Sequence, residues 1–258
     1  MEDEAGCCRR REKRECTTKA GNFQLQSWNE RQFAFGLRFL TTASTADVNS
    51  CHQVLLRMDS DDWGGAGTIP FCVHEGRVLF LLQQTKGGKK EGTLIDFGGA
   101  RDDSKDTSVR YCAAREFTEE TAGLFTTASL SKDVASLNCL SQSAIESSPL
   151  IQKEVDSCMA LVDEAYSRQL WAVTDRVNSE WYVSFAIRIP YSDLVLQNEF
   201  YGDESKRKVR IFYWVTASVF TSLLQRKTTF QNLPLHERVH CLNSLESLIS
   251  KIVASESS

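Results

Sequence analysis

The sequence predicts an α/β fold in which helices pack against a sheet. Four stretches rich in β-branched and aromatic residues are typical of strands: 66–74, 78–84, 179–190 and 208–216. Residues 108–121 contain no glycine or proline and many good helix formers, which predicts a helix. Apolar residues recur at helical spacing in 217–225 and 235–254, so two amphipathic helices are expected there.

The composition is that of a soluble globular protein. Of the 258 residues, 41% are hydrophobic and 25% are charged, and the net charge of −4 indicates no particular partner. No run approaches the roughly 18 apolar residues of a membrane span, and no secretory signal is expected. The nine cysteines are scattered without a C-x-x-C pair, which fits reduced thiols better than disulfides or a zinc site. We therefore expect a cytoplasmic or nuclear protein that does not bind membranes.

The chain divides into three parts by composition. Residues 1–20 are polar and include a basic run at 9–14, which predicts a disordered lead that serves as a nuclear signal or only as a solvated tail. Residues 21–64 mix aromatic and polar positions and are interpreted as an extension packed on the core. The main domain is expected over 65–258, with an insertion at about 125–175 that begins Ser/Thr-rich and ends in a helix at 151–170.

The first strands lead towards a pair of glycines. The segment 74–77 predicts a hairpin turn between 66–74 and 78–84. The glycine-rich segment 85–92 predicts a loop, and Lys86, Lys89 and Lys90 in it are either phosphate contacts, if the loop faces a site, or ordinary surface lysines. A short strand at 93–97 would then deliver the chain to Gly98 and Gly99, where glycine suits a backbone that passes close to a ligand.

The helix predicted at 108–121 carries an unusual set of charges. Glu116, Glu119 and Glu120 stand at i, i+3 and i+4 and are therefore neighbours on one face. Their repulsion is relieved by a divalent cation, because Mg²⁺ and Mn²⁺ take oxygen ligands. Arg115 can reach back and orient one of the carboxylates. The alternative interpretation is a solvated acidic face without a ligand.

The segment Arg115-Glu-Phe-Thr-Glu-Glu120, with Gly98 and Gly99 upstream, resembles the Nudix box, G-x5-E-x7-R-E-U-x-E-E-x-G-U. The chain departs from this signature in four places. The segment from Gly99 to Arg115 is two residues longer, and Thr107 takes the place of the first Glu with Asp106 beside it. Ala122 stands where the signature has Gly, and Phe97 precedes the glycines where Pro is frequent.

The resemblance covers about 65–254 and implies an α/β/α sandwich with a mixed sheet. It implies metal-dependent hydrolysis of a diphosphate linkage, in a nucleoside diphosphate linked to another moiety or in a related compound. Glu116, Glu119, Glu120 and the Gly99 carbonyl would hold Mg²⁺ or Mn²⁺. Glu116 would accept a proton, unless an acidic residue of the loop 198–208 does so, and Arg115 would orient the glutamates. The loop residues in question are Glu199, Asp203 and Glu204.

Several questions stay open at the level of the sequence. The substrate is expected to be a small diphosphate, with or without a nucleotide, and capped RNA stays open; Trp63, Trp171 and Trp181 either stack a base or pack in the core. Nothing indicates the oligomeric state. One alternative function is that of a Nudix-fold binding or regulatory module without turnover. Another is a zinc protease, because His236-Glu-Arg-Val-His240 spells H-E-x-x-H, although a coincidental spelling is favoured.

Overall fold

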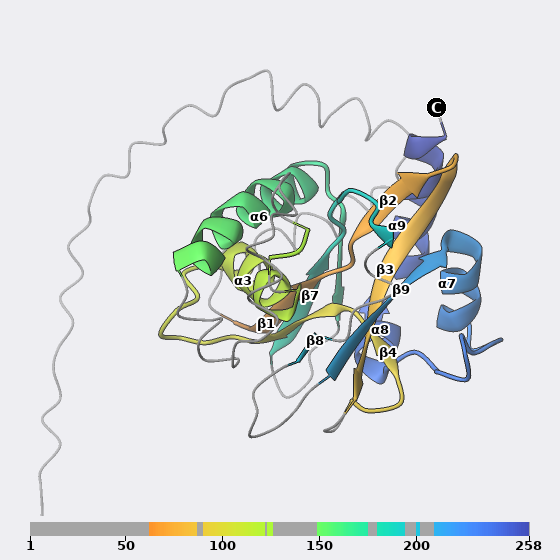
Figure 1. Cartoon of the computed structure of the whole chain (residues 1–258), viewed down its shortest axis with the longest axis horizontal. Coiled ribbons are helices and arrows are strands. Elements are labelled where there is room, and N and C mark those ends of the chain that lie inside the picture. Colours follow the sequence, from red (N-terminus) through yellow and green to blue (C-terminus); the bar gives the residue numbers. More distant parts are fainter. Residues whose placement is uncertain are drawn as a thin grey trace, which may run out of the picture. The chain divides into compact units, whose positions relative to one another are not determined.

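The computed structural model describes residues 62–86, 90–121, 123–125, 149–174, 180–193, 200–201 and 209–257 (Figure 1). They lie in the unit His52–Ser258, and the fold described is that of this unit. The expected lead (1–20), all but the last residues of the expected extension (21–64), and the insertion residues 126–148 lie outside the described residues. Strands and helices are mixed along the chain, so the predicted α/β class is confirmed.

One sheet combines parallel and antiparallel pairs. In the described part its strand order is β10-β6-β7-β1-β5. The strands are β1 (Trp63–Thr68), β5 (Phe97–Ala100), β6 (Trp171–Thr174), β7 (Trp181–Phe185) and β10 (Leu242–Asn243). β1 pairs with β7 in parallel and with β5 antiparallel, so this is the expected mixed sheet.

A second sheet is antiparallel among the described strands. Its strands are β2 (Phe71–His74), β3 (Arg77–Lys86), β9 (Val209–Thr216) and β8 (Phe200–Tyr201), in that order, and β4 (Leu94–Ile95) pairs with β3. The predicted hairpin is present, because Glu75 and Gly76 adopt φ values of 50° and 71° in a two-residue turn between β2 and β3. The run 66–74, expected as one strand, is instead divided between β1 and β2, which lie in different sheets.

Helices lie on both sides of the sheets (Figure 1). α3 (Val109–Thr121) packs on β1 and β5, and α6 (Pro149–Ser167) packs on α3. α7 (Ala217–Leu224) and α9 (Leu245–Glu256) contact each other and β3, on the other side. The helix expected in the insertion is therefore present as α6. In the part of the chain that the structure describes, none of the helices could cross a membrane.

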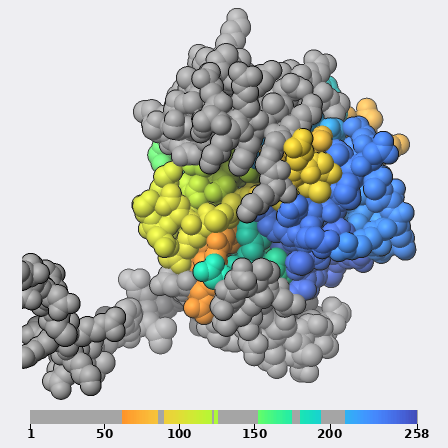
Figure 2. All heavy atoms as spheres, turned by 90° about the horizontal axis from the view of Figure 1, so that it is seen from below, coloured from red at the N-terminus to blue at the C-terminus, as the bar shows by residue number. Residues whose placement is uncertain are grey.

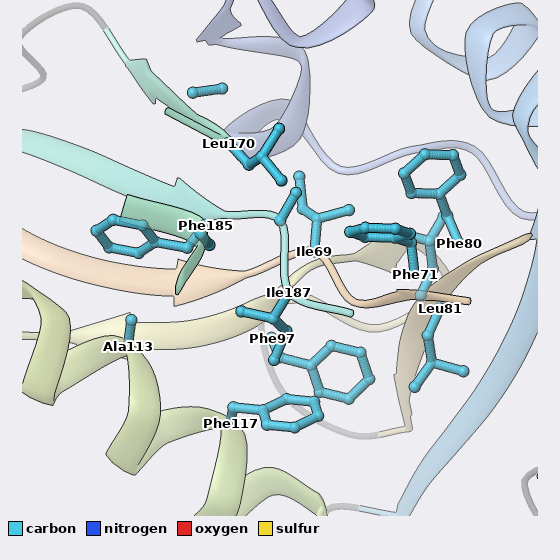
Figure 3. Packing of buried hydrophobic residues seen from close by; sticks show 14 of the residues in the cluster. Ile69, Phe71, Phe80, Leu81, Phe97, Ala113, Phe117, Leu170, Phe185 and Ile187 are labelled. Carbon is cyan, nitrogen blue, oxygen red and sulfur yellow. The ribbon is translucent and has the colours of Figure 1, made fainter. Parts of the chain in front are cut away.

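Aromatic side chains join α3 to both sheets. Phe97 of β5 meets Phe117 of α3 edge to face at 5.3 Å between ring centroids (Figure 3). Phe212 of β9 lies at the same distance from Phe97. All three rings are fully buried. Burying a Phe side chain stabilises a fold by about 1.5–3 kcal/mol, so this cluster holds the acidic helix firmly against the strand that carries the glycines.

The prediction of a single helix at 235–254 is wrong. The structure has α8 (Glu237–His240), then β10, then α9. A strand pairing and a backbone turn interrupt the helix. Leu242 and Asn243 pair with β6, and Ser244 adopts a left-handed φ of 64° before α9 begins. The amphipathic period in the sequence persists because the apolar side chains of both pieces are buried, Val239 and Leu248 among them.

Candidate functional site

The acidic helix begins and ends as its sequence leads one to expect. Ser108 caps it by accepting a hydrogen bond from the N–H of Tyr111 at 3.1 Å. At the other end Gly123, with φ 73°, donates its N–H to the carbonyl of Thr118 at 2.9 Å. Gly123, one position later than the signature's glycine, therefore closes the helix. Val109, Ala113 and Phe117, which recur every four residues, form the buried side of the helix that packs on β1 and β5.

Arg115 is the centre of the charge network on this helix. Its Nε and Nη2 donate to the two oxygens of Asp106 at 2.8 and 2.9 Å, and the Asp106 side chain is completely buried. Its Nη1 lies 2.9 Å from Glu119 Oε2 and 3.0 Å from Glu116 Oε1. Arg115 thus brings Glu116 and Glu119 to one nitrogen atom, Nη1.

The lengthened loop before α3 places Asp106 at Arg115. The N–H groups of Lys105 and Asp106 both donate to the carbonyl of Asp102, at 2.9 and 2.7 Å, and the N–H of Asp102 donates to Asp106 Oδ2 at 2.7 Å. Asp106 therefore lies beside Arg115, whereas Thr107 is exposed.

Glu116 lies between the other two glutamates. Its pKa is raised to about 7, first by burial and then by the charges of Glu120 and Glu119, while Arg115 acts in the opposite direction. Its carboxylate lies directly over Gly99, where a β-carbon would collide with it. The predicted association of Gly99 with the acidic helix is therefore a direct contact with Glu116. A bound cation would lower this pKa again, because positive charge favours the carboxylate.

Glu120 is held by three groups from other elements. Its Oε2 accepts from the N–H of Gly98 at 2.9 Å and from Gln83 Nε2 at 2.5 Å. Its Oε1 accepts from Arg210 Nη1 at 2.6 Å. Gln83 and Arg210 come from β3 and β9 of the antiparallel sheet, and Gly98 comes from β5 of the mixed sheet. Glu120 therefore ties α3 to both sheets. Neither partner was predicted, because no local pattern connects them with the acidic helix.

Gly98 and Gly99 lie within strand β5, although the sequence suggested a turn. Gly98 pairs with Gly67 of β1, and a side chain at Gly98 would collide with the backbone of β1 and with Tyr182. The requirement for glycine therefore comes from close packing of strands as well as from the proximity of Glu116. The peptide of Gly98 is fixed on both sides, because Glu120 accepts from its N–H and Arg238 donates to its carbonyl at 3.0 Å.

A second buried network supports this strand. Arg238 donates to Asp96 Oδ1 from Nε and Nη2, at 3.0 and 2.7 Å, and lies 4.6 Å from the centroid of the Tyr182 ring. Asp96 Oδ2 accepts from Tyr182 Oη at 2.9 Å and from Ser184 Oγ at 3.1 Å. Asp96 is fully buried, so each of these donors compensates its desolvation. The only sequence signal was an Asp inside an apolar strand.

The H-E-x-x-H segment supports this network and shows no metal-binding geometry. His236 is the N-cap of α8, with extended backbone, and its Nδ1 accepts from the N–H of Arg238 at 3.1 Å. His240 ends the single helical turn, so the two histidines do not share one helix face as a zinc site requires. The middle residue, Arg238, has the structural function. Burial first, and then the charges of Arg238 and Lys90, lower the pKa of His236.

The remaining predicted residues fall into three groups. Lys90 lies near the site: burial lowers its pKa, and its charge interacts with Arg238, Glu120, Asp96 and Arg210. Trp63 and Trp181 are buried in the core and Trp171 packs against it, which fits the packing role. Lys89, Ala122, Glu199, Asp203, Glu204 and the side chain of Lys86 lie outside the described residues. Among the described side chains, no three carboxylates, histidines or cysteines already surround a single metal position.

Comparisons with known proteins give structural neighbours only. No family profile matches the chain, and no curated protein matches it. Structural neighbours include Ap4A hydrolase from C. elegans, at 12% identity over 74% of this chain and 96% of that chain, with a TM-score of 0.35. The Nudix hydrolase RenU from M. smegmatis aligns at 14% identity over 75% and 86%, with a TM-score of 0.35. The Nudix domain of Shewanella oneidensis NrtR, solved with ADP ribose, aligns at 12% identity over 84% and 97%, also with 0.35. Likeness at this level does not decide the activity of this chain.

Proposed function

We propose that this chain hydrolyses a diphosphate linkage in a reaction that depends on Mg²⁺ or Mn²⁺. The observation that carries the proposal is the convergence of Glu116 and Glu119 on Arg115. The carboxylate of Glu116 lies directly against Gly99, and Glu120 follows Glu119 on the same helix. The substrate would be a nucleoside diphosphate linked to another moiety or a related diphosphate. An acidic cluster that served only for solubility would lie exposed, whereas Glu119 and Glu120 are 8% and 7% exposed.

The side chains present fit a hard divalent cation. The donors are carboxylate oxygens, and the absence of a side chain at Gly99 lets the Glu116 carboxylate lie against the backbone of β5. We assign the cation to Glu116 and Glu119, with Glu120 joining once it exchanges Arg210, and to the Gly99 carbonyl as the family resemblance suggests. When bound, the cation supplies neutralisation of the diphosphate charge and Lewis-acid polarisation of its oxygens.

The other tasks fall to residues of this chain. Arg115 keeps Glu116 and Glu119 in position, because its remaining donors are anchored on the buried Asp106. Glu116 lies between the other carboxylates and is the group to which we assign the proton of the attacking water. Gly98 and Asp96 hold the strand against which the substrate would lie, through Glu120 and Arg238.

The test is phosphate or nucleoside-monophosphate release from a panel of diphosphates with Mg²⁺ or Mn²⁺. We expect turnover of at least one compound by the wild type and its loss in Glu119→Gln. Glu164→Gln is the matched control, because Glu164 is an exposed helical glutamate that pairs only with Arg168 in the described part. Turnover that survives in Glu119→Gln would contradict the assignment.

Cation binding provides a second measurement. A cation that binds the folded chain raises the melting temperature, by an amount equivalent to about 2.7 kcal/mol at a concentration of 100 Kd. We expect Mn²⁺ to raise the melting temperature of the wild type and of Glu164→Gln but not of Glu119→Gln. No shift in the wild type would reject the metal site itself.

The second candidate function is a binding or regulatory module of the same fold without turnover. It is favoured by the internal pairing of the carboxylates, because Arg115 pairs with Glu116 and Glu119 while Arg210 pairs with Glu120. If Mn²⁺ raises the melting temperature and the whole panel is left intact, this second function replaces the first.

A further inference from the structure

Three arginines, Arg115, Arg210 and Arg238, lie on or beside the acidic helix. Two of them use all their donor nitrogens within the protein. Arg115 directs Nε and Nη2 at Asp106 and Nη1 at Glu116 and Glu119. Arg238 directs Nε and Nη2 at Asp96 and Nη1 at the Gly98 carbonyl. Neither guanidinium retains an edge for a ligand, so both are positioning groups.

Arg210 differs from both in this respect. Its hydrogen bonds run through Nη1 alone, to Gln83 Oε1 at 2.7 Å and to Glu120 Oε1 at 2.6 Å. Within the described residues, neither Nε nor Nη2 has a hydrogen-bond partner. The side chain is 12% exposed. A guanidinium anchored at one nitrogen in this way presents the edge formed by Nε and Nη2, whose spacing matches two oxygens of a phosphate group.

The surroundings of Arg210 favour an anion. Burial is the largest cause that lowers the pKa of Lys90; the charges of Arg238 and Arg210 lower it as well, while those of Glu120 and Asp96 raise it. Arg238 pairs with Asp96 and Arg210 pairs with Glu120, so Lys90 adds a third cation beside these two ion pairs. The gold segment before β5 lies against the blue C-terminal part of the chain in the space-filling view (Figure 2). Lys90 itself lies close to Glu120 and Arg210, because its charge interacts with both of theirs.

We propose that Arg210 binds a phosphoryl group of the substrate through its Nε–Nη2 edge, with Lys90 as the second cation of this subsite. The inference rests on the proposed function and adds the part of the site that recognises the anion. Gln83 keeps the guanidinium in place, together with Glu120 until Glu120 exchanges it for the cation. Glu116 and Glu119 lie on the same helix as Glu120. The diphosphate then lies between a cationic group on β9 and the carboxylates on α3.

The test uses methylenediphosphonate, a diphosphate analogue that cannot be hydrolysed, and measures its binding by calorimetry in Mg²⁺. We expect Arg210→Gln to weaken this binding by about ten- to hundredfold, as for a hydrogen-bonded charge. Arg210→Lys keeps the charge without the fork and should recover part of the affinity. Lys90→Met should weaken binding less. Arg226→Gln is the control, because Arg226 is 62% exposed and pairs with Glu237.

A purely structural role of Arg210 predicts a different result. Arg210→Gln removes a competing cation from Glu120, so the affinity for Mn²⁺, measured by electron paramagnetic resonance, should be equal or higher while the diphosphonate affinity falls. A parallel loss of both affinities would show that Arg210 only holds the fold and would overturn the proposal, as would unchanged diphosphonate affinity.

The outcomes also separate this inference from the proposed function. If the panel is not hydrolysed but diphosphonate binding depends on Arg210, the subsite stands and the hydrolase does not. If the panel is hydrolysed with the same KM in Arg210→Gln, the hydrolase stands and the subsite does not.

Discussion

At the scale of single residues, a few buried charges decide the geometry of the site. Arg115 and Asp106 form a bidentate pair with both side chains at or below 8% exposure, and Arg115 also pairs with two glutamates. Burying a charge is unfavourable unless a partner compensates it, so each member of this group requires the others. The acidic cluster therefore depends on Asp106, although Asp106 precedes the acidic helix.

Loss of Arg115 should be strongly destabilising. We expect Arg115→Gln to lower the free energy of unfolding by about 3–5 kcal/mol, because Asp106 stays buried without a cation. Urea unfolding at pH 7 measures the change. Arg110→Gln is the matched control: Arg110 and Asp163 are 38% and 47% exposed, so their pair contributes under about 1 kcal/mol. Equal small losses in the two variants would refute the role of Arg115.

At the scale of elements, short segments connect the acidic helix with the rest of the fold. Residues 234–238 run beside β4: the N–H of Leu94 donates to the Pro234 carbonyl at 2.9 Å, and the N–H of His236 donates to the Leu94 carbonyl at 2.8 Å. α8 then begins with His236 as its cap, and this brings Arg238 to Asp96. A one-turn helix is unstable by itself, so the cap and these contacts hold it.

The cap predicts a dependence of stability on pH. The pKa of His236 is lowered in the folded chain from 6.5, mainly by burial, so the unfolded chain binds the proton more readily. The free energy of unfolding should therefore fall as the pH drops below about 6.5 and stop falling once the folded chain is protonated too. Protonation also removes the Nδ1 acceptor of the cap.

Melting temperatures between pH 7 and pH 5 test this. We expect a smaller loss in His236→Asn than in the wild type, because Asn caps a helix without titrating in this range. Identical profiles for the two proteins would mean that His236 does not contribute to the dependence.

At the scale of the whole described molecule, two networks join segments that are far apart in the sequence. Arg210 reaches Glu120 over 90 positions and Arg238 reaches Asp96 over 142. Together they connect both sheets, α3 and the C-terminal segment. The two networks meet at Gly98, whose N–H donates to Glu120 and whose carbonyl accepts from Arg238. The site is thus assembled only when the chain from β3 to α8 has folded, which is expected for contacts of high sequence separation.

The Arg238–Asp96 pair should behave as one unit. We expect Arg238→Gln and Asp96→Asn each to cost about 3–5 kcal/mol, because each leaves a buried polar partner without its compensation. The double variant should cost less than the sum, with a coupling of about 0.5–3 kcal/mol. Chemical denaturation of the four proteins measures this cycle, and strictly additive losses would show that the two side chains act independently.

The sequence by itself determined the local features of this protein. The helix Val109–Thr121 and the clustering of Glu116, Glu119 and Glu120 follow from a helical period that depends only on neighbouring residues. The hairpin at Glu75 and Gly76 follows in the same way from turn chemistry. Such features could be predicted because each is decided within a few positions of the chain.

Only the tertiary structure decided which groups meet those glutamates. Gln83, Arg210, Asp96 and Arg238 reach the site through strand pairing and buried ion pairs, and no local pattern connects them. The same holds for the interruption of the expected C-terminal helix, where pairing of β10 with β6 outweighs helical propensity. The physical reason is that a buried charge selects its partner by position in space, and position in space is decided only when the sheets have formed.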